Sequence, residues 1–260
     1  MNDFFHRFGQ PGGLFRGKAP EDLSSWAIFK LIESVQVRLV YQPVVDLENG
    51  TVYAFEALAR SNSSHYDSPV DMFHAASKAG LSGRLGHMLR RMAVEECPNQ
   101  RLFLNVNPNE FDHDYLMRGD DPVFSHLAEV FLEITETVPL SHFQMCHSIL
   151  EEVRGRGVSL AIDDLGAGFS NLKYIADLEP EIVKFDRSLI SNADRSERQR
   201  RLMGALVHLC NDMGARVVAE GIETEGELKA VIDSGAHYGQ GYYLARPAYP
   251  PPLVNWPEAR

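Results

Sequence analysis

The chain has 260 residues, of which 44% are hydrophobic and 23% charged, and its formal net charge is −11. This composition is typical of a globular protein, and the negative charge argues against general nucleic-acid binding, which needs a basic surface. The sequence contains no run of about 18 apolar residues, the length that predicts a membrane span. Its first residues do not resemble a signal peptide. Three widely spaced cysteines indicate free thiols, so we expect a cytoplasmic location.

The N-terminal part predicts a β-hairpin preceded by one helix. The expected elements are an irregular arm over residues 1–23, a helix over 24–34, and strands over 37–45 and 51–60. Asn49-Gly50 separates the two strands, and this dipeptide is a strong hairpin signal because both residues tolerate positive φ. The first two strands should therefore be antiparallel.

From residue 69 onward, helices and strands are expected to alternate. Helices are predicted near 69–79, 83–96, 121–129, 141–155, 171 onward, 195–213 and 224–234, and strands over 101–108, 130–136, 158–163, 182–186, 215–221 and 236–243. This alternation predicts a parallel sheet, either an open doubly wound sheet or a closed barrel. Prolines at 247 and 250–252 end the regular structure, so the predicted domain spans 24–250 and a C-terminal tail spans 251–260.

Polar residues near the strand ends separate the open sheet from the barrel. Seven apolar strands each carry one near the C-terminal end: Glu56, Asn105, Glu133, Asp163, Lys184, Glu220 and Gln240. An open sheet gathers ligands at one crevice, whereas a closed barrel places all strand ends around one mouth. We therefore predict a TIM-like (β/α)8 barrel whose first strand is antiparallel to the others.

The carboxylates among these residues predict a metal site. Asp163 and Asp164 are adjacent at the end of a buried strand, where two like charges repel unless a cation neutralises them. Read alone, this pair is equally consistent with a solvated Asx turn. With the other strand ends, it gives an oxygen-ligand set that suits Mg²⁺, Mn²⁺ or Ca²⁺ rather than zinc, and two such ions suit phosphoryl chemistry. Lys184 would add a cation or a hydrogen-bond donor.

One segment, Phe55-Glu56-Ala57-Leu58-Ala59-Arg60, resembles the signature of the EAL-domain family, bacterial phosphodiesterases that cleave cyclic di-GMP. The resemblance covers about residues 25–247. It continues in order through Gln42-Pro43, Leu104-Asn105-Val106, Glu133-Ile134-Thr135-Glu136, Asp163-Asp164-Leu165-Gly166-Ala167-Gly168-Phe169, Lys184-Phe185-Asp186, Ala219-Glu220-Gly221-Ile222-Glu223 and Gln240-Gly241-Tyr242. Departures from the family pattern include Ser61, Ser77, Asn107, Leu165 and Asn171, none of which is an expected metal ligand.

The resemblance implies a role for each matching residue. The implied metal ligands for two Mg²⁺ or Mn²⁺ ions are Glu56, Asn105, Glu133, Asp163, Asp164 and Glu220, with Asp163 bridging the ions. The implied catalytic residues are Lys184, Glu220, Glu56 and Gln240, and the substrate contacts are Gln42, Arg60, Leu58 and Asp186. Residues expected to couple the loop after Asp164 to a dimer interface are Glu136, Gly166, Gly168, Phe169 and Glu223. Calcium is expected to bind but to inhibit.

The predicted function is hydrolysis of cyclic di-GMP to linear pGpG. The resemblance also implies a homodimer, and regulation would come from oligomerisation, the N-terminal arm or a regulatory protein partner. The alternative is a catalytically weak or inactive member of the same fold that acts as a cyclic di-GMP receptor or protein-binding adaptor. A more remote alternative is a barrel enzyme that uses Mg²⁺ on another anion.

Overall fold

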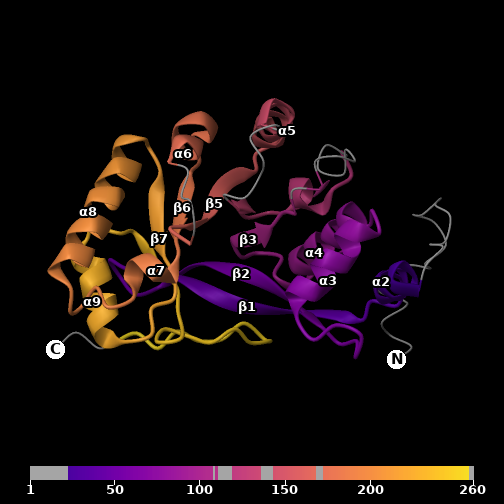
Figure 1. The fold of residues 1–260 in the computed structure, drawn as a ribbon, viewed down its shortest axis with the longest axis horizontal. Helices are drawn as coiled ribbons and strands as arrows, with labels where there is room; N and C mark the ends of the chain where they lie inside the picture. Colours follow the sequence, from indigo (N-terminus) through magenta and orange to yellow (C-terminus); the bar gives the residue numbers. More distant parts are fainter. Residues whose placement is uncertain (1–22, 108, 111–118, 136–142, 168–171, 258–260) are drawn as a thin grey trace.

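Eight strands in the described residues form a closed barrel (Figure 1). The computed structural model describes residues 23–107, 109–110, 119–135, 143–167 and 172–257. In chain order the strands are β1 (Val37–Asp46), β2 (Val52–Ser61), β3 (Leu102–Asn105), β4 (Val130–Thr135), β5 (Ser159–Leu165), β6 (Ile182–Phe185), β7 (Arg216–Ala219) and β8 (Tyr238–Gly239). Strand β1 is antiparallel to both β2 and β8, and the other neighbouring pairs are parallel. The predicted barrel with a reversed first strand is confirmed.

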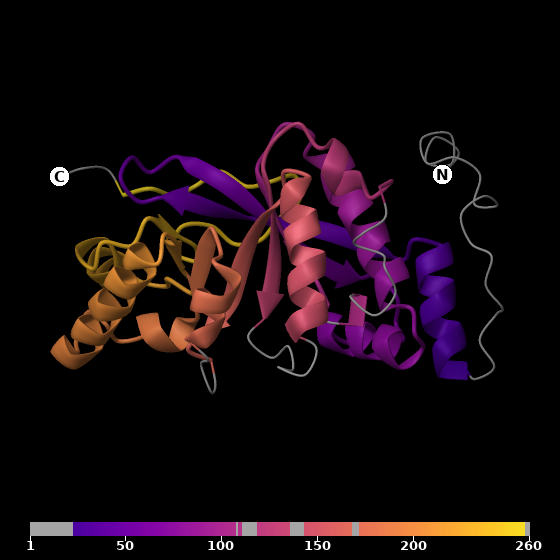
Figure 2. The ribbon, with the colours of Figure 1, turned by 90° about the horizontal axis from the view of Figure 1, so that it is seen from above.

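Helices surround this barrel on its outer side. They are α2 (Leu23–Glu33), α3 (Pro69–Lys78), α4 (Ser82–Glu96), the 3₁₀ helix η3 (Pro122–Ser125), α5 (Phe143–Gly155), α6 (Lys173–Leu178), α7 (Arg187–Ile190), α8 (Glu197–Asp212) and α9 (Glu225–Asp233). In both ribbon views α2, α3 and α4 gather at one end of the molecule, and α8 and α9 lie at the other (Figures 1 and 2). Among the described residues, none of the helices combines the length and apolarity needed to cross a bilayer.

Three elements differ most clearly from the sequence-based prediction, and β3 and β7 are each shorter than the strands expected over 101–108 and 215–221. The helix expected over 121–129 is only η3, because the Asp121 side chain caps a single short turn and the chain is extended again at His126. Helix α7 was not predicted; it begins where the Asp186 carboxylate accepts a hydrogen bond from the Ser188 backbone. The last strand was expected over 236–243 and spans only β8, after which Gly241 packs directly against the Ile222 backbone.

The hairpin between β1 and β2 forms as predicted. The Asp46 carboxylate accepts hydrogen bonds from the backbone of Glu48 and Asn49, and Gly50 has φ +73°. These contacts close the turn with the left-handed conformation that glycine tolerates. The strands then pair from Val45 opposite Val52 to Val37 opposite Ser61.

The barrel interior contains one apolar layer built from all eight strands. Its members are Val44, Ala54, Phe103, Phe131, Ala161, Ile182, Val218 and Tyr238. A separate, larger cluster of buried apolar residues packs the strands and helices together. Because side chains alternate between the two faces of a strand, the next inward-facing position on each strand is two residues away. The composition of that next layer therefore determines what lines the barrel mouth.

The described part of the C-terminal segment packs against the hairpin turn. The Asn255 backbone donates to the Leu244 carbonyl at 2.8 Å, and Trp256 is partly buried against the core. A Cβ atom placed on Gly50 would lie 2.5 Å from the Trp256 ring. This contact fixes the described part of the tail on the barrel. The division of the chain into an arm, a domain over 24–250 and a tail stays a prediction.

Substitution of Gly50 measures how much the contact with Trp256 constrains the turn. We expect Gly50→Ala to lower the free energy of unfolding by about 1–2 kcal/mol through its positive φ and by about 1–3 kcal/mol more through the clash with Trp256. Gly80→Ala is the matched control, because Gly80 has φ +65° and no heavy atom within 4 Å of its Cβ position. Urea denaturation of both variants gives the comparison, and equal losses would show that the tail does not press on the turn.

Candidate active site

The polar side chains of the barrel mouth lie one inward-facing position beyond the apolar layer. On seven strands, the position two residues after the member of that layer carries a polar side chain: Glu56, Asn105, Glu133, Asp163, Lys184, Glu220 and Gln240. On the reversed strand β1 the equivalent position, two residues earlier, is Gln42. Strand alternation alone thus brings together side chains that are up to 198 residues apart in the chain. The seven residues predicted from strand ends share this mouth.

The sequence predicted that Glu56 lies near the end of its strand, but in the structure it lies in the middle of β2. Strand β2 pairs with β3 only from Phe55 to Ala57 and then continues to Ser61 paired with β1 alone. The barrel wall therefore ends near the middle of β2, where Glu56 is opposite Gln42 of β1 and Phe103 of β3.

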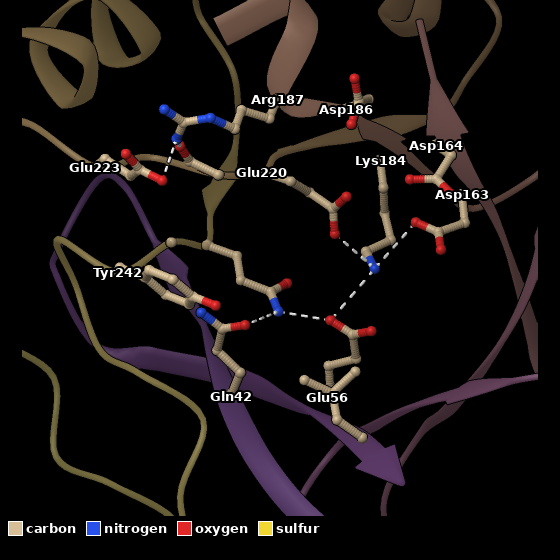
Figure 3. Close-up of a pocket in the computed structure, with 14 residues that line it drawn as sticks. Gln42, Glu56, Asp163, Asp164, Lys184, Asp186, Arg187, Glu220, Glu223 and Tyr242 are labelled. Carbon is tan, nitrogen blue, oxygen red and sulfur yellow. Dashed lines mark hydrogen bonds and ion pairs between the residues drawn. The ribbon is translucent and has the colours of Figure 1, made fainter. Parts of the chain in front are cut away.

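Lys184 is the centre of the site (Figure 3). Its side chain is 1% exposed, and its Nζ lies 2.5 Å from Glu133 Oε1, 2.7 Å from Glu220 Oε1, 3.1 Å from Asp163 Oδ1 and 3.5 Å from Glu56 Oε2. One ammonium group therefore contacts carboxylates from four different strands. Burial alone would lower the pKa of Lys184, but the surrounding carboxylates raise it well above its usual value, so the side chain stays charged.

The carboxylates carry more negative charge than Lys184 can balance. Burial raises the pKa of Glu133 well above its ordinary value, against the lowering effect of Lys184. Burial, together with the charge of Asp163, raises the pKa of Asp164 to about 6. Burial raises the pKa of Glu220 to about 8 although Lys184 opposes this shift. Retained protons therefore relieve part of the charge repulsion.

Amide side chains connect the carboxylates across the mouth. Gln240 Nε2 donates to Glu56 Oε2 at 2.6 Å and to Gln42 Oε1 at 3.1 Å, which joins β8, β1 and β2. Asn105 Nδ2 donates to Glu133 Oε2 at 2.9 Å and approaches Glu56 Oε1 at 3.4 Å. These bonds orient the carboxylates toward one another.

A break in strand alternation brings Asp163 and Asp164 to the same site. Consecutive residues of a regular strand point to opposite faces, but the β5–β6 register shifts between Ile162 and Leu165, and Asp164 has φ +61°. Such a conformation is unfavourable for a residue other than glycine and is held by the surrounding structure. As a result, oxygen atoms of Asp163, Asp164 and Glu220 lie within 4.8 Å of one another.

This donor set fits oxygen-preferring divalent cations. Its ligand atoms are carboxylate and amide oxygens, the type that Mg²⁺ and Mn²⁺ prefer, and four carboxylates face a single ammonium. Glu56, Asn105, Glu133, Asp163, Asp164 and Glu220 could hold such ions. The roles given to them by sequence resemblance stay predictions.

Residues expected to contact a substrate line two neighbouring cavities. A cavity of about 370 Å³ opens over Lys184, and Gln42, Leu58, Asp186 and Glu223 all line it. Arg60 instead lines a second cavity of about 570 Å³, which adjoins α3 and shares Leu58 with the first. Asn105 also lines this second cavity.

Two side chains that line the first cavity, those of Arg187 and Tyr242, were given no role from the sequence. Arg187 pairs with Glu223 at 2.6 Å and donates to the Gly221 carbonyl at 2.8 Å, which joins the start of α7 to the loop after β7. Tyr242 lies at the rim with an exposed ring, over which the Arg246 guanidinium lies at 4.3 Å. The only available signal was their position beside Asp186 and Gln240 in the matched motifs.

Part of the loop after Asp164 belongs to the described residues. Gly166 has φ +109°, its carbonyl accepts from Ser188 Oγ at 2.9 Å, and Leu189 leaves no room for a side chain on it. Leu165 is buried. Glu136, Gly168 and Phe169, which were expected to couple this loop to a dimer interface, lie outside the described residues.

Comparison with known proteins gives consistent matches. The model of the EAL domain family matches residues 27–247. The cyclic di-GMP phosphodiesterase PA2567 of Pseudomonas aeruginosa is 31% identical over 265 residues, covering 94% of this chain but 45% of that protein. The chain thus spans less than half the length of this relative.

Solved structures with the same fold also match. The EAL enzyme Bd1971, bound to cAMP and cyclic di-GMP, has a TM-score of 0.77 and 26% identity over 86% of this chain and 65% of that one. Klebsiella pneumoniae BlrP1 in a complex with manganese and cyclic di-GMP has a TM-score of 0.72 and 29% identity, covering 82% of this chain and 56% of that one.

The raised carboxylate pKa values predict how stability depends on pH. Folding raises the pKa of Asp164 to about 6 and of Glu220 to about 8, so the folded state retains protons that the unfolded state has lost. The metal-free protein should therefore lose stability as the pH rises from about 4.5 to 8. Thermal unfolding with a chelator present measures this fall.

Divalent cations should reverse the fall, because they bind the deprotonated carboxylates. We expect the increase in melting temperature caused by Mn²⁺ to be larger at pH 8 than at pH 6. Glu220→Gln should flatten the metal-free profile near pH 8, whereas Glu225→Gln, at an exposed position of α9, should not. A Mn²⁺ effect that does not grow with pH would contradict this account.

Proposed function

Because this chain belongs to the EAL domain family, we propose that it is a metal-dependent phosphodiesterase that hydrolyses cyclic di-GMP to linear pGpG through a water activated by two metal ions. The observation that supports this most directly is the cluster of four carboxylates around Lys184 at the barrel mouth. A relative of 31% identity is named a cyclic di-GMP phosphodiesterase, and BlrP1 was solved with manganese and cyclic di-GMP.

Six side chains would hold the ions. In this proposal Glu56, Asn105, Glu133 and Asp163 would hold one Mg²⁺ or Mn²⁺, and Asp163, Asp164 and Glu220 would hold a second. In the structure the Asn105 amide donates through Nδ2. Rotation of the amide would turn its oxygen toward the ion. When bound, the ions lower the pKa of a water molecule and offset charge on the phosphoryl oxygens.

Lys184 and Glu220 would orient the attacking water. The ammonium of Lys184 keeps its protons and therefore acts as a donor, while the Glu220 carboxylate, 2.7 Å away, accepts a hydrogen bond from the water. The water oxygen would form a bond to phosphorus as one of its protons passes to solvent, the bond from phosphorus to the 3′ oxygen would break, and that oxygen would take up a proton from solvent. Gln240, which the resemblance implies to be catalytic, donates to Glu56, so we assign it the orientation of that carboxylate.

The two cavities suggest how a substrate longer than the metal cluster is held. Gln42, Leu58 and Asp186 line the cavity over Lys184, and Arg60 lines the neighbouring cavity beyond Leu58. A cyclic dinucleotide with its scissile phosphate over Lys184 could place one nucleoside in the second cavity, where Arg60 provides a positive charge. The proposal further includes a cytoplasmic location, a homodimer, inhibition by calcium, and regulation through the N-terminal arm or a partner protein.

A chromatographic assay tests the proposed reaction. Purified protein incubated with cyclic di-GMP and Mg²⁺ or Mn²⁺ should produce pGpG, and Ca²⁺ should compete with these ions without supporting turnover. Tight binding of cyclic di-GMP with no pGpG under any of the metals would contradict the enzyme and favour the receptor alternative.

Two substitutions test the central residues. Glu56→Ala and Lys184→Ala should each lower kcat by at least about 100-fold, because each removes a group that stabilises the transition state or its metals. Lys229→Ala, at an exposed position of α9, is the matched control and should leave kcat unchanged. Circular dichroism checks that the variants remain folded, and near-normal turnover in either would refute the role of that residue.

A further inference from the structure

A buried ion network lies behind the barrel wall next to Asn105. Arg90 of α4 is 1% exposed, and its guanidinium contacts Glu110 at 2.6 Å and Asp121 at 2.8 Å. Both carboxylates are also buried, at 1% and 2% exposure. No sequence pattern indicated this network, because its members are separated along the chain and belong to none of the recognised motifs.

Stability alone is a weak reason for such a network. Removing several charged groups from water is costly, and apolar residues of similar volume often stabilise a protein equally well. The two carboxylates also differ in what else they hold. Asp121 accepts a hydrogen bond from the Val123 backbone and caps η3, whereas Glu110 is directed toward the loop that leaves β3.

Glu110 divides its two oxygens between Arg90 and that loop. Oε2 accepts from Arg90 Nη1, and Oε1 accepts from the Asn107 backbone at 3.0 Å. The Glu110 backbone in turn donates to the Asn107 carbonyl at 2.8 Å. The peptide two residues after Asn105 is therefore held by a carboxylate that is itself held by a buried guanidinium.

Two further contacts leave little freedom in this arrangement. A Cβ atom on Gly86 of α4 would lie 2.2 Å from Glu110 Oε2, so the carboxylate rests directly on the helix backbone. On the other side, the Val106 backbone donates to the Glu133 carbonyl at 3.0 Å. The chain after Asn105 is thus fixed between α4 and β4, while the Asn105 amide contacts the Glu133 carboxylate at 2.9 Å.

We propose that the Arg90–Glu110 ion pair is a positioning device for Asn105, which fixes the Asn107 backbone and so directs the Asn105 amide into the metal site. Arg90 and Glu110 are positioning residues, since neither belongs to the cluster around Lys184. The inference rests on the proposed function only in assuming that Asn105 is a metal ligand.

A matched pair of isosteric substitutions tests this role. In Glu110→Gln one oxygen remains for two donors, so either Arg90 or the Asn107 backbone faces an NH₂ group. Asp121→Asn makes the same chemical change on the other side of Arg90 without touching Asn107. We expect both variants to lower the melting temperature, but only Glu110→Gln to weaken Mn²⁺ binding in calorimetry, by about 10-fold, the scale reported for outer partners of metal ligands.

A double substitution identifies the route of the effect. If Glu110 acts through Asn105, then Glu110→Gln should not weaken Mn²⁺ binding further in an Asn105→Ala background. In the metal-free protein, hydrogen exchange of the Asn107 amide should be faster in Glu110→Gln than in Asp121→Asn. Glu110→Asp, which keeps the charge but withdraws the carboxylate, provides the same comparison if Glu110→Gln does not fold.

The proposal would be overturned by unchanged Mn²⁺ affinity in the Glu110 variants, by an equal loss in Asp121→Asn, or by additive losses in the double variant. Absence of pGpG formation in a wild-type protein that binds Mn²⁺ would instead refute the proposed function and leave the positioning result intact. A wild-type protein that binds no Mn²⁺ would refute the metal role of Asn105, and with it this inference.

Discussion

The barrel mouth depends on the ion cluster around the Lys184 ammonium. Four carboxylates from four strands meet one buried positive charge, and like charges in a poorly solvated site repel one another strongly. Protons retained by Glu220 below about pH 8, and by Asp164 below about pH 6, offset part of the excess negative charge in the metal-free protein. Divalent cations can replace those protons, so the same imbalance of charge favours the binding of a metal ion. Lys184 reduces the repulsion between the carboxylates without abolishing it.

The arrangement of the site follows from the period of a β-strand. An apolar side chain in each strand fills the barrel interior, and the side chain two residues along enters the mouth. The polar members of this pattern can be recognised in the sequence because carboxylates at the ends of apolar strands are unusual. The closed barrel could be inferred for the same reason, since an open sheet would not bring Glu56 and Glu220 together. Hairpin chemistry at Asn49-Gly50 fixed the direction of the first strand.

Features that depend on tertiary contacts could not be predicted. The second carboxylate of the Asp163–Asp164 pair reaches the site only because the strand register shifts and Asp164 adopts a positive φ, which local sequence does not indicate. Similarly, no local pattern near Arg90 indicates that its partners lie 20 and 31 residues further along the chain. The Arg187–Glu223 pair joins the start of α7 to the loop after β7, and the alternation of helices and strands predicts the positions of these segments only approximately. Local patterns predicted strands, whereas these contacts require the closed barrel.

The hydrogen bond between Gln240 and Gln42 has a consequence for folding kinetics. Strands β8 and β1 pair through only two residue pairs, Val45 with Gly239 and Asp46 with Tyr238, and this seam joins the two ends of the barrel sequence. Contacts between such distant residues form late, because loop-closure entropy opposes them until other contacts are in place. The Gln240–Gln42 bond spans the same seam. The polar mouth is therefore complete only once the β8–β1 seam has formed, and a chain with an open seam lacks the Gln240–Gln42 bond.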